Sequence, residues 1–367
     1  MARNLSGWIR QAPDSRDYRH HVPRRVLANL PDYFDLSPGM GPLLDQGDLG
    51  SCGPNTADEC ITFDQKVEGL PATGASRLFV YYCTRSLMGT VSQDSGVDNR
   101  TMMKALNGYG YPPESAWPYD VSKFTQKPPA AVITAAAANK IVSYAAVAQD
   151  LATMKGTLVG GRPIVFGFDV FSQIESAACA KTGIVAMPSG SPIGGHDVTV
   201  VGFSDVQRPG VKAGNVWPAN TFKFRNHWTN DDGSPWGDGG YGYIPYAYAT
   251  GSHASDFWVI NAVPGAVVPP GPTPPAPVPP KPPEPSVNYV LTGTVKVPFL
   301  GDAKMTGVLV PANSMPADDV ATLSVPPDLW PLLREYGMKI LPVVFADLMA
   351  GKKWQDIVKD VLAAFAA

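Results

Sequence analysis

Hydrophobic and polar positions follow two different patterns along the chain, and the change falls near Pro163. Between residues 52 and 155, apolar side chains recur at helical spacing in SRLFVYYCTRSL and NRTMMKALNGYG, while the alanine-rich PPAAVITAAAANKIVSY fits either a helix or an irregular surface segment. From Pro163 onward the apolar runs are short, aromatic and β-branched, as in PIVFGFDVF, HDVTVVGFSD, TFKFRNHW and GYGYIPYAY. Helices first and strands afterwards predict an α+β fold and not a doubly wound sheet.

A proline-rich stretch at residues 264–285 marks the clearest boundary. More than half of its residues are proline, which excludes a helix or a central strand and favours an extended spacer with a reach of roughly 70 Å. We therefore expect a short N-terminal segment (1–29), a main domain (30–263), this linker, and a small C-terminal module (286–367).

The C-terminal module is predicted to contain one or two strands followed by amphipathic helices. NYVLTGTVKVPFLG is strand-like, and the last helix carries a single apolar stripe formed by Trp354, Ile357, Val358, Val361, Leu362 and Phe365. Such a stripe is ordinarily core. In a module of this size it also suits docking to a protein partner or self-association, and the sequence leaves these alternatives open.

Charge and hydropathy exclude several classes of function. The chain has 29 basic and 32 acidic side chains and a net charge of −3, without a basic block that would bind nucleic acid. The N-terminal residues lack the apolar core of a signal peptide, and no run approaches the roughly 20 apolar residues of a membrane span. We expect a location in the cytoplasm or, by a route without a signal peptide, outside the cell or in a particle.

The four cysteines do not form a metal-binding or disulfide framework. No CxxC pair is present, and Cys60, Cys83 and Cys179 are predicted to be buried free thiols, with one bridge among them as the alternative. The acidic loop NDDGSPWGDGG lacks the EF-hand spacing, which favours Asx turns over a calcium site. We predict neither a metal nor another cofactor.

Cys52 differs from the other cysteines in its neighbours. Gly50 and Gly53 flank it, and Pro54 suits the first turn of a helix, so the thiol is predicted to lie at a helix N-terminus. The helix dipole favours the reactive thiolate there, but by only about 1 kcal/mol, which is under one pKa unit. A neighbouring imidazolium would have to supply the rest.

His196 and Asn226 are the candidate partners of this thiol. His196 opens an alternating strand directly after two glycines, whereas the other histidines lie in polar contexts. Asn226 follows a predicted strand, where its amide can accept the histidine N–H and orient the ring, and Trp228 can shield that hydrogen bond. The order and separation of Cys52, His196 and Asn226 fit a papain-type nucleophile and base.

Five ordered segments between about residues 30 and 262 resemble the papain-like cysteine peptidases. DQGDLGSC, GGHDVTVVGF and RNHWTNDDGSPWGDGGYGYIPY resemble the three active-site blocks, LPDYFDL the start of the mature domain, and DSGVDNRTMMKALNGYGYPPESAWPYD the non-primed side of the cleft. The resemblance implies a helical lobe led by the nucleophile helix and a β-barrel-like lobe that carries histidine and asparagine. It also implies hydrolysis of a protein or peptide substrate through an acyl-enzyme.

The resemblance implies a role for each residue that matches a block. Cys52 corresponds to the nucleophile, His196 to the acid and base, and Asn226 to the residue that orients it. Gln46 corresponds to the oxyanion-hole glutamine, which acts with the Cys52 backbone N–H, and Trp228 corresponds to the shielding tryptophan.

Specificity and control are less clearly indicated. Gly167 and Asp197 correspond to positions near the S2 pocket, where an acid would favour a basic P2 residue, although Asp197 could equally face solvent or an internal partner. Gly53 stands where the family usually has tryptophan, which is expected to leave room beside the nucleophile. The roughly 30 residues before the mature-like domain are far fewer than the usual inhibitory propeptide.

The sequence therefore predicts a cysteine endopeptidase with two alternatives. One is a catalytically silent relative that serves as a structural or binding component, which Gly53 and the short N-terminal segment favour slightly. The other keeps the chemistry but acts as an isopeptide or peptidoglycan amide hydrolase.

Overall fold

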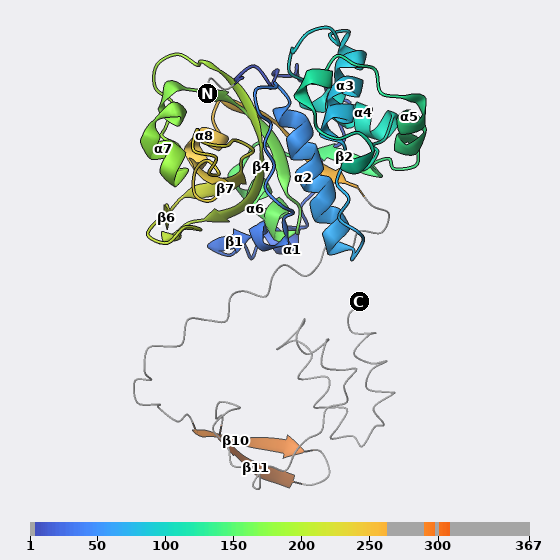
Figure 1. Ribbon diagram of the computed structural model, residues 1–367. Coiled ribbons are helices and arrows are strands. Elements are labelled where there is room, and N and C mark those ends of the chain that lie inside the picture. The colour runs from blue at the N-terminus through green and yellow to red at the C-terminus, as the bar shows by residue number, and fades with distance from the viewer. Residues whose placement is uncertain (1–3, 263–289, 298–300, 309–367) are drawn as a thin grey trace. The chain divides into compact units, whose positions relative to one another are not determined.

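A seven-stranded antiparallel sheet organises residues 4–262, which the computed structural model describes together with the backbone of residues 290–297 and 301–308 (Figure 1). The strand order is β2-β9-β3-β4-β7-β8, and β1 pairs with the end of β4. The strands are β1 (Tyr33–Asp35), β2 (Ser143–Ala146), β3 (Ile164–Val170), β4 (Gly194–Ser204), β7 (Thr221–Arg225), β8 (Tyr241–Pro245) and β9 (Ala254–Asn261).

Four helices form the other half of this unit: α2 (Cys52–Val67), α3 (Arg77–Met88), α4 (Asn99–Gly108) and α5 (Ala130–Ala137). Local sequence sets their ends, since the side chains of Ser76 and Asp98 accept the Phe79 and Thr101 backbone N–H groups at the starts of α3 and α4. Gly89, in the left-handed region, ends α3. The alanine-rich segment, for which the sequence allowed either a helix or an irregular surface segment, contains the helix α5.

Shorter elements complete the unit: α1 (Arg24–Leu27), α6 (Leu151–Val159), α7 (Ala177–Thr182), α8 (Tyr246–Ala249), β5 (Arg208–Pro209), β6 (Val216–Trp217), η1 (Ser37–Gly39), η2 (Glu114–Ala116), η3 (Val121–Lys123) and η4 (Ser172–Glu175). The sequence pattern did not predict α6, α7 or β9. GYGYIPYAY, predicted as one strand, divides into β8 and α8, and Pro245 is the N-cap of that helix.

Helix α2 is buried on all sides over residues 52–65, between β4 and β9 on one side and α3 on the other. Burial all round explains why its sequence has no single apolar stripe. Glu59 of α2 forms an ion pair with Arg225, with Oε1 2.9 Å from Nε, and accepts a 2.6 Å hydrogen bond from Thr199 Oγ1. These contacts fix the helix to β4 and β7.

The chain divides into two units, and the second spans Pro280–Ala367. Its described residues are an antiparallel pair, β10 (Val290–Val297) and β11 (Gly301–Val308). The linker and the predicted C-terminal helices lie outside the described residues, so the proposed domain bounds and the docking role of this module stay predictions. Among the described helices, none has both the length and the apolar character to cross a membrane.

Candidate active site

Cys52 is the first residue of α2, as the Gly-Ser-Cys-Gly-Pro sequence predicts. Its side chain has no exposed surface. Burial raises the pKa of the thiol and the nearby Asp197 carboxylate raises it further, while the backbone N–H groups of Asp197 and Gly53 act in the opposite direction. In this closed arrangement the thiol is held in its protonated form.

His196, Asn226 and Trp228 lie together at the end of the sheet. His196 Nε2 is 2.9 Å from Asn226 Oδ1, which also accepts the His227 backbone N–H at 2.9 Å. Two donors on this oxygen fix the amide orientation, so the proton of the imidazole is assigned to Nε2. The Trp228 indole stacks on the His196 ring, with 4.1 Å between the centroids. Asp197, which follows His196 in β4, lies close enough to Cys52 for its carboxylate and its backbone N–H to act on the thiol.

Gln46 is nearly fully buried on the loop before α2 and is held there by His227, whose polar sequence context had not marked it as a candidate. The Gln46 side chain donates from Nε2 to Leu49 O at 2.9 Å, and its Oε1 lies 2.7 Å from His227 Nδ1. Burial lowers the pKa of His227 well below its usual range, with His196 adding to the effect. A neutral His227 therefore orients the Gln46 amide. Its position directly after Asn226 was the only sequence signal for this role.

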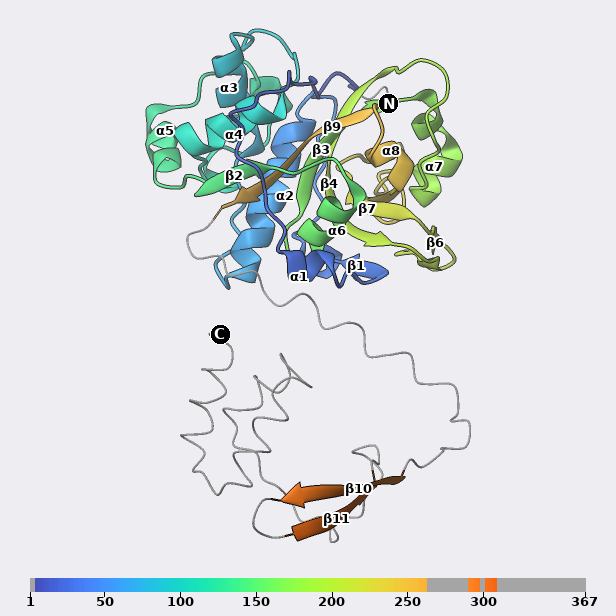
Figure 2. The ribbon, with the colours of Figure 1, turned by 180° about the vertical axis from the view of Figure 1, so that it is seen from behind.

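The N-terminal residues pass directly in front of Cys52, along the line where the family resemblance predicts the substrate groove. We call residues 4–11 the N-terminal strap. Val97 donates its backbone N–H to Gly7 O at 3.0 Å and accepts the Ile9 N–H at 2.9 Å, and the Gly195 N–H donates to Leu5 O at 2.6 Å. Gly7 passes so close to the thiol that a Cβ on it would lie 2.5 Å from Sγ. Although short, the segment before α1 thus covers the thiol, and Figure 2 shows its onward path along the far side of the molecule.

Gly167 and Asp197 have different surroundings. The indole of Trp8 lies directly against Gly167, where any Cβ would overlap its ring. Asp197 is fully buried, and its Oδ1 accepts a 3.1 Å hydrogen bond from Asn99 Nδ2. Asp197 therefore has an internal partner, which is the alternative to a specificity role that the sequence left open.

Gly53 does not leave room beside the nucleophile, contrary to the expectation from the missing tryptophan. A Cβ at Gly53 would lie 2.9 Å from Val97 Cγ2, 3.2 Å from Asp197 Oδ2 and 3.3 Å from Met102 Sδ. Neighbouring side chains thus fill the space, and only glycine fits at this position without a shift of these atoms.

Asp94 connects the loop before Cys52 to α3 and to the loop that follows it. Its carboxylate accepts the Gly50 backbone N–H at 3.0 and 3.1 Å and the Tyr81 hydroxyl hydrogen, and Tyr81 Oη in turn accepts the Gly96 N–H at 3.1 Å. Asn4 of the strap also donates to Asp94, at 2.5 Å. The same carboxylate thus holds the nucleophile loop and one end of the strap.

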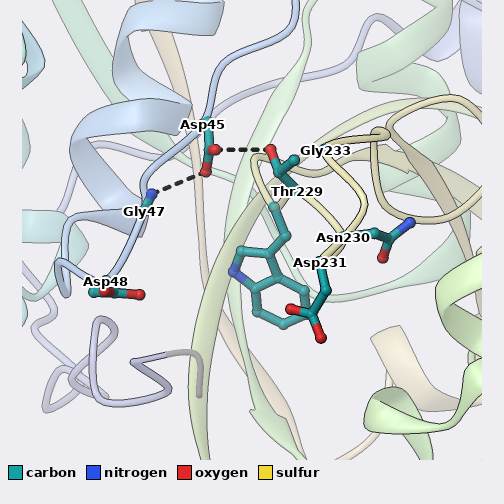
Figure 3. A pocket seen from close by; sticks show the side chains of 8 residues that line it. Asp45, Gly47, Asp48, Thr229, Asn230, Asp231 and Gly233 are labelled. Carbon is teal, nitrogen blue, oxygen red and sulfur yellow. Dashed lines mark hydrogen bonds between the residues drawn. The ribbon is translucent and has the colours of Figure 1, made fainter. Parts of the chain in front are cut away.

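A hollow of about 480 Å³ adjoins the site and is lined in part by Trp228 (Figure 3). Asp45 lies in its wall and accepts hydrogen bonds from the Gly47 N–H at 2.9 Å and from Thr229 Oγ1 at 2.7 Å. Asp48 and Asp231 also line it. These contacts join the loop before α2 to the loop after β7.

The acidic loop after β7 is built from turns, as predicted. Asp232 Oδ1 accepts the Ser234 N–H at 2.9 Å, which closes an Asx turn, and the Asp238 carboxylate accepts the backbone N–H groups of Val211 and Lys212. Within the part of the chain that the structure describes, no group of three or more His, Cys, Asp or Glu side chains could hold a metal ion. All four cysteines are buried and none forms a disulfide, which confirms the prediction of buried, unbridged thiols for Cys60, Cys83 and Cys179.

Comparison with known proteins identifies the family. An uncharacterized peptidase C1-like protein of Acanthamoeba polyphaga mimivirus is 34% identical over an alignment of 296 residues, and the match covers 73% of this chain and 90% of that protein. The chain belongs to the papain family of cysteine peptidases. Xylellain, a cysteine protease from Xylella fastidiosa, is 32% identical, with 72% of this chain and 98% of xylellain covered and a TM-score of 0.62. No family model matches the chain.

The papain-family fold is found again at lower identity. A proCathepsin B from Trypanosoma congolense is 18% identical, with 71% of this chain and 87% of that chain covered and a TM-score of 0.55. The predicted α+β, papain-like fold is confirmed. As a papain-family member the protein is a cysteine peptidase, a hydrolase that acts on peptide bonds.

Proposed function

We propose that the protein is an endopeptidase in which Cys52 attacks the peptide carbonyl. His196 takes the thiol proton through Nδ1 and later passes it to the leaving amine, so that an acyl-enzyme forms and water then hydrolyses it. Asn226 keeps the His196 ring in the required tautomer and orientation, and Trp228 shields their hydrogen bond.

The observation that carries this proposal is the 2.9 Å contact between His196 Nε2 and Asn226 Oδ1, together with a thiol at a helix N-terminus on which Asp197, the next residue after His196, acts directly. With Nε2 committed to the asparagine, Nδ1 is the nitrogen that exchanges a proton with Cys52. The stacked Trp228 keeps water from the contact, which strengthens it.

Gln46 is proposed to stabilise the oxyanion together with the Cys52 backbone N–H. One hydrogen of its Nε2 is donated to Leu49 O, and the other is available to a developing negative charge. His227 fixes Oε1 at 2.7 Å, so the amide is oriented before the substrate arrives.

Cleavage within a chain, and not at its end, is supported by the strap itself. The strap runs past the thiol with hydrogen-bonded residues on both sides of Gly7, from Leu5 to Ile9. A groove that holds an extended peptide on both sides of the nucleophile suits an internal peptide bond. The strap occupies that groove, so it has to move before a substrate binds.

The test is hydrolysis of a library of internally quenched peptides by the full chain and by Trp8→Ala, which weakens the strap. We expect Cys52→Ala and His196→Ala, each combined with Trp8→Ala, to abolish turnover. Cys83→Ala, the removal of a buried thiol in α3, is the matched control and should retain it. Turnover that survives Cys52→Ala contradicts the mechanism. Failure of both the full chain and Trp8→Ala to cleave any peptide favours the catalytically silent alternative.

A further inference from the structure

Asp197 places a buried carboxyl beside the nucleophile. The residue has no exposed surface, and its Oδ2 lies 3.2 Å from the position that a Cβ on Gly53, the residue after Cys52, would occupy. Because residue 53 is glycine, the carboxyl fits directly against the start of α2. The backbone N–H of Asp197 also acts on the thiol, so both its main chain and its side chain influence the charge of Cys52.

The two oxygens of this carboxyl differ in their contacts. Oδ1 accepts a 3.1 Å hydrogen bond from Asn99 Nδ2, which also donates to the Asp256 backbone carbonyl at 3.0 Å. Oδ2 is buried, and no group in the described part of the chain donates to it. A charge on an oxygen that has neither water nor a donor costs more free energy than an unpaired hydroxyl does. Oδ2 is therefore the atom that retains a proton.

The surroundings of Asp197 favour this neutral form. The titratable groups around it are Cys52 and Cys60 on α2, Asp256 on β9, His227 after β7 and the preceding residue, His196. Burial raises the pKa of the Asp197 carboxyl well above its usual range, the Asn99 hydrogen bond acts in the opposite direction, and Asp256 adds to the rise. Two neighbouring anions repel each other, so a carboxylate at Asp197 opposes a thiolate at Cys52.

We propose that Asp197 is a positioning residue that determines whether Cys52 is a thiolate. While Asp197 is protonated, the Cys52 thiolate and the His196 imidazolium leave the three groups with no net charge. When Oδ2 loses its proton to water, the imidazolium returns its Nδ1 proton to Sγ, and a single negative charge remains, on Asp197. The proposal rests on the proposed function, because it takes Cys52 and His196 as the nucleophile and its base.

The proposal gives the site a pH dependence of defined sign. Because the pKa of Asp197 is raised, the protonated form and the thiolate persist to a higher pH than an ordinary aspartic acid would allow, and both are lost as the pH rises further. Asparagine cannot ionise, so Asp197→Asn should keep the thiolate where the aspartic acid has lost its proton. This variant retains the Oδ1 acceptor for Asn99, and its new N–H groups displace no donor at Oδ2.

The experiment measures the rate at which iodoacetamide labels Cys52, from about pH 4 to about pH 9, in Trp8→Ala and in Trp8→Ala/Asp197→Asn. Mass spectrometry of the digested protein identifies the labelled cysteine. We expect equal rates near pH 4.5, where Asp197 is protonated, and about tenfold faster labelling of the double variant near pH 7.5. Asp58→Asn in the same background removes another buried carboxyl of α2, one that is held by Ala75 and Thr62. It is the matched control and should leave both rates unchanged.

Identical profiles, or a difference of the same size at every pH, would overturn the proposal, because a purely structural change does not depend on the proton of Asp197. If Asp197→Asn does not fold, Asn99→Ala is the second test. Without the Asn99 donor, Asp197 ionises less readily, so the loss of labelling should move to higher pH, and no movement would overturn the proposal.

Hydrolysis of the quenched peptides is measured separately from labelling. A gain in labelling near pH 7.5 without hydrolysis of any peptide would support the role of Asp197 and refute the endopeptidase. Hydrolysis whose pH profile is the same with and without Asp197→Asn would support the endopeptidase and refute the role of Asp197.

Discussion

The two walls of the groove are held in different ways. On the sheet wall, His196 Nε2 already lies 2.9 Å from Asn226 Oδ1 and Trp228 is stacked on the histidine, at the start of β4 and in the buried residues just after β7. On the helix wall, Cys52 starts α2 beneath the strap, and its pKa is raised by burial and by Asp197. The proposed base and its support are thus in place while the proposed nucleophile is covered. The difference indicates that activation requires the strap to move away from the thiol. It does not require His196, Asn226 and Trp228 to rearrange.

The connection between the walls should show the largest effect on stability. Arg225→Ala leaves Glu59 buried without its ion partner, and we expect the free energy of unfolding to fall by roughly 3–5 kcal/mol, measured by urea denaturation. Arg16→Ala, which removes an exposed ion pair with Asp14, is the matched control and should leave the midpoint unchanged. A midpoint for Arg225→Ala equal to that of the unaltered chain would mean that the walls do not depend on this connection.

Gln46→Ala tests whether the helix wall contributes to the chemistry as well as carrying the thiol. In the Trp8→Ala background we expect kcat to drop by about 10²–10³ with little change in KM, because one oxyanion donor is lost. Gln126→Ala, on the exposed surface, is the control. A change confined to KM would instead assign Gln46 to substrate binding.

Uncovering the thiol should shift its pH dependence. A raised pKa means that at neutral pH less of the thiol is thiolate than for an ordinary cysteine, so iodoacetamide labels Cys52 of the intact chain slowly. Trp8→Ala removes a buried ring and should speed labelling about ten- to hundredfold, with the half-maximal rate moving to lower pH. A profile identical to that of the intact chain would show that the strap does not control the thiol.

The smallest effect is expected at the other end of the strap. Asn4→Ala removes one hydrogen bond to Asp94 and should raise the labelling rate of Cys52 about fivefold. Asn29→Ala, at an exposed position after α1, serves as the control. If Asn4→Ala and Trp8→Ala had equal effects, the strap would detach as one unit and not from its ends.

The catalytic candidates could be found from sequence because each lies in a contiguous block with its own local signal. Cys52 lies between glycines, His196 opens a strand, and Asn226 ends one. His227 could not be found in this way. Its contact with Gln46 comes from a distant loop and leaves no local signal in the sequence.

The strap was also beyond the reach of sequence patterns. Residues 4–11 have neither helical nor alternating periodicity, and their backbone hydrogen bonds are made with Val97 and Gly195, far away in the chain. Length alone suggested that the N-terminal segment was too short to be the usual inhibitory propeptide of the family. An extended chain spans roughly 3.3–3.6 Å per residue. A few extended residues can therefore cover the thiol, whereas a folded segment would need many more residues to span the same distance.

The Asp94 contact has a consequence for the solvent conditions that the protein tolerates. The Asp94 carboxylate holds the loop before Cys52 by accepting the Gly50 backbone N–H and is itself held by the Tyr81 hydroxyl, and none of the four cysteines forms a disulfide. A strong reductant that keeps Cys52 from oxidising therefore has no S–S bond to cleave anywhere in the chain. Reducing conditions that keep the Cys52 thiol from oxidising therefore leave the fold around Cys52 intact.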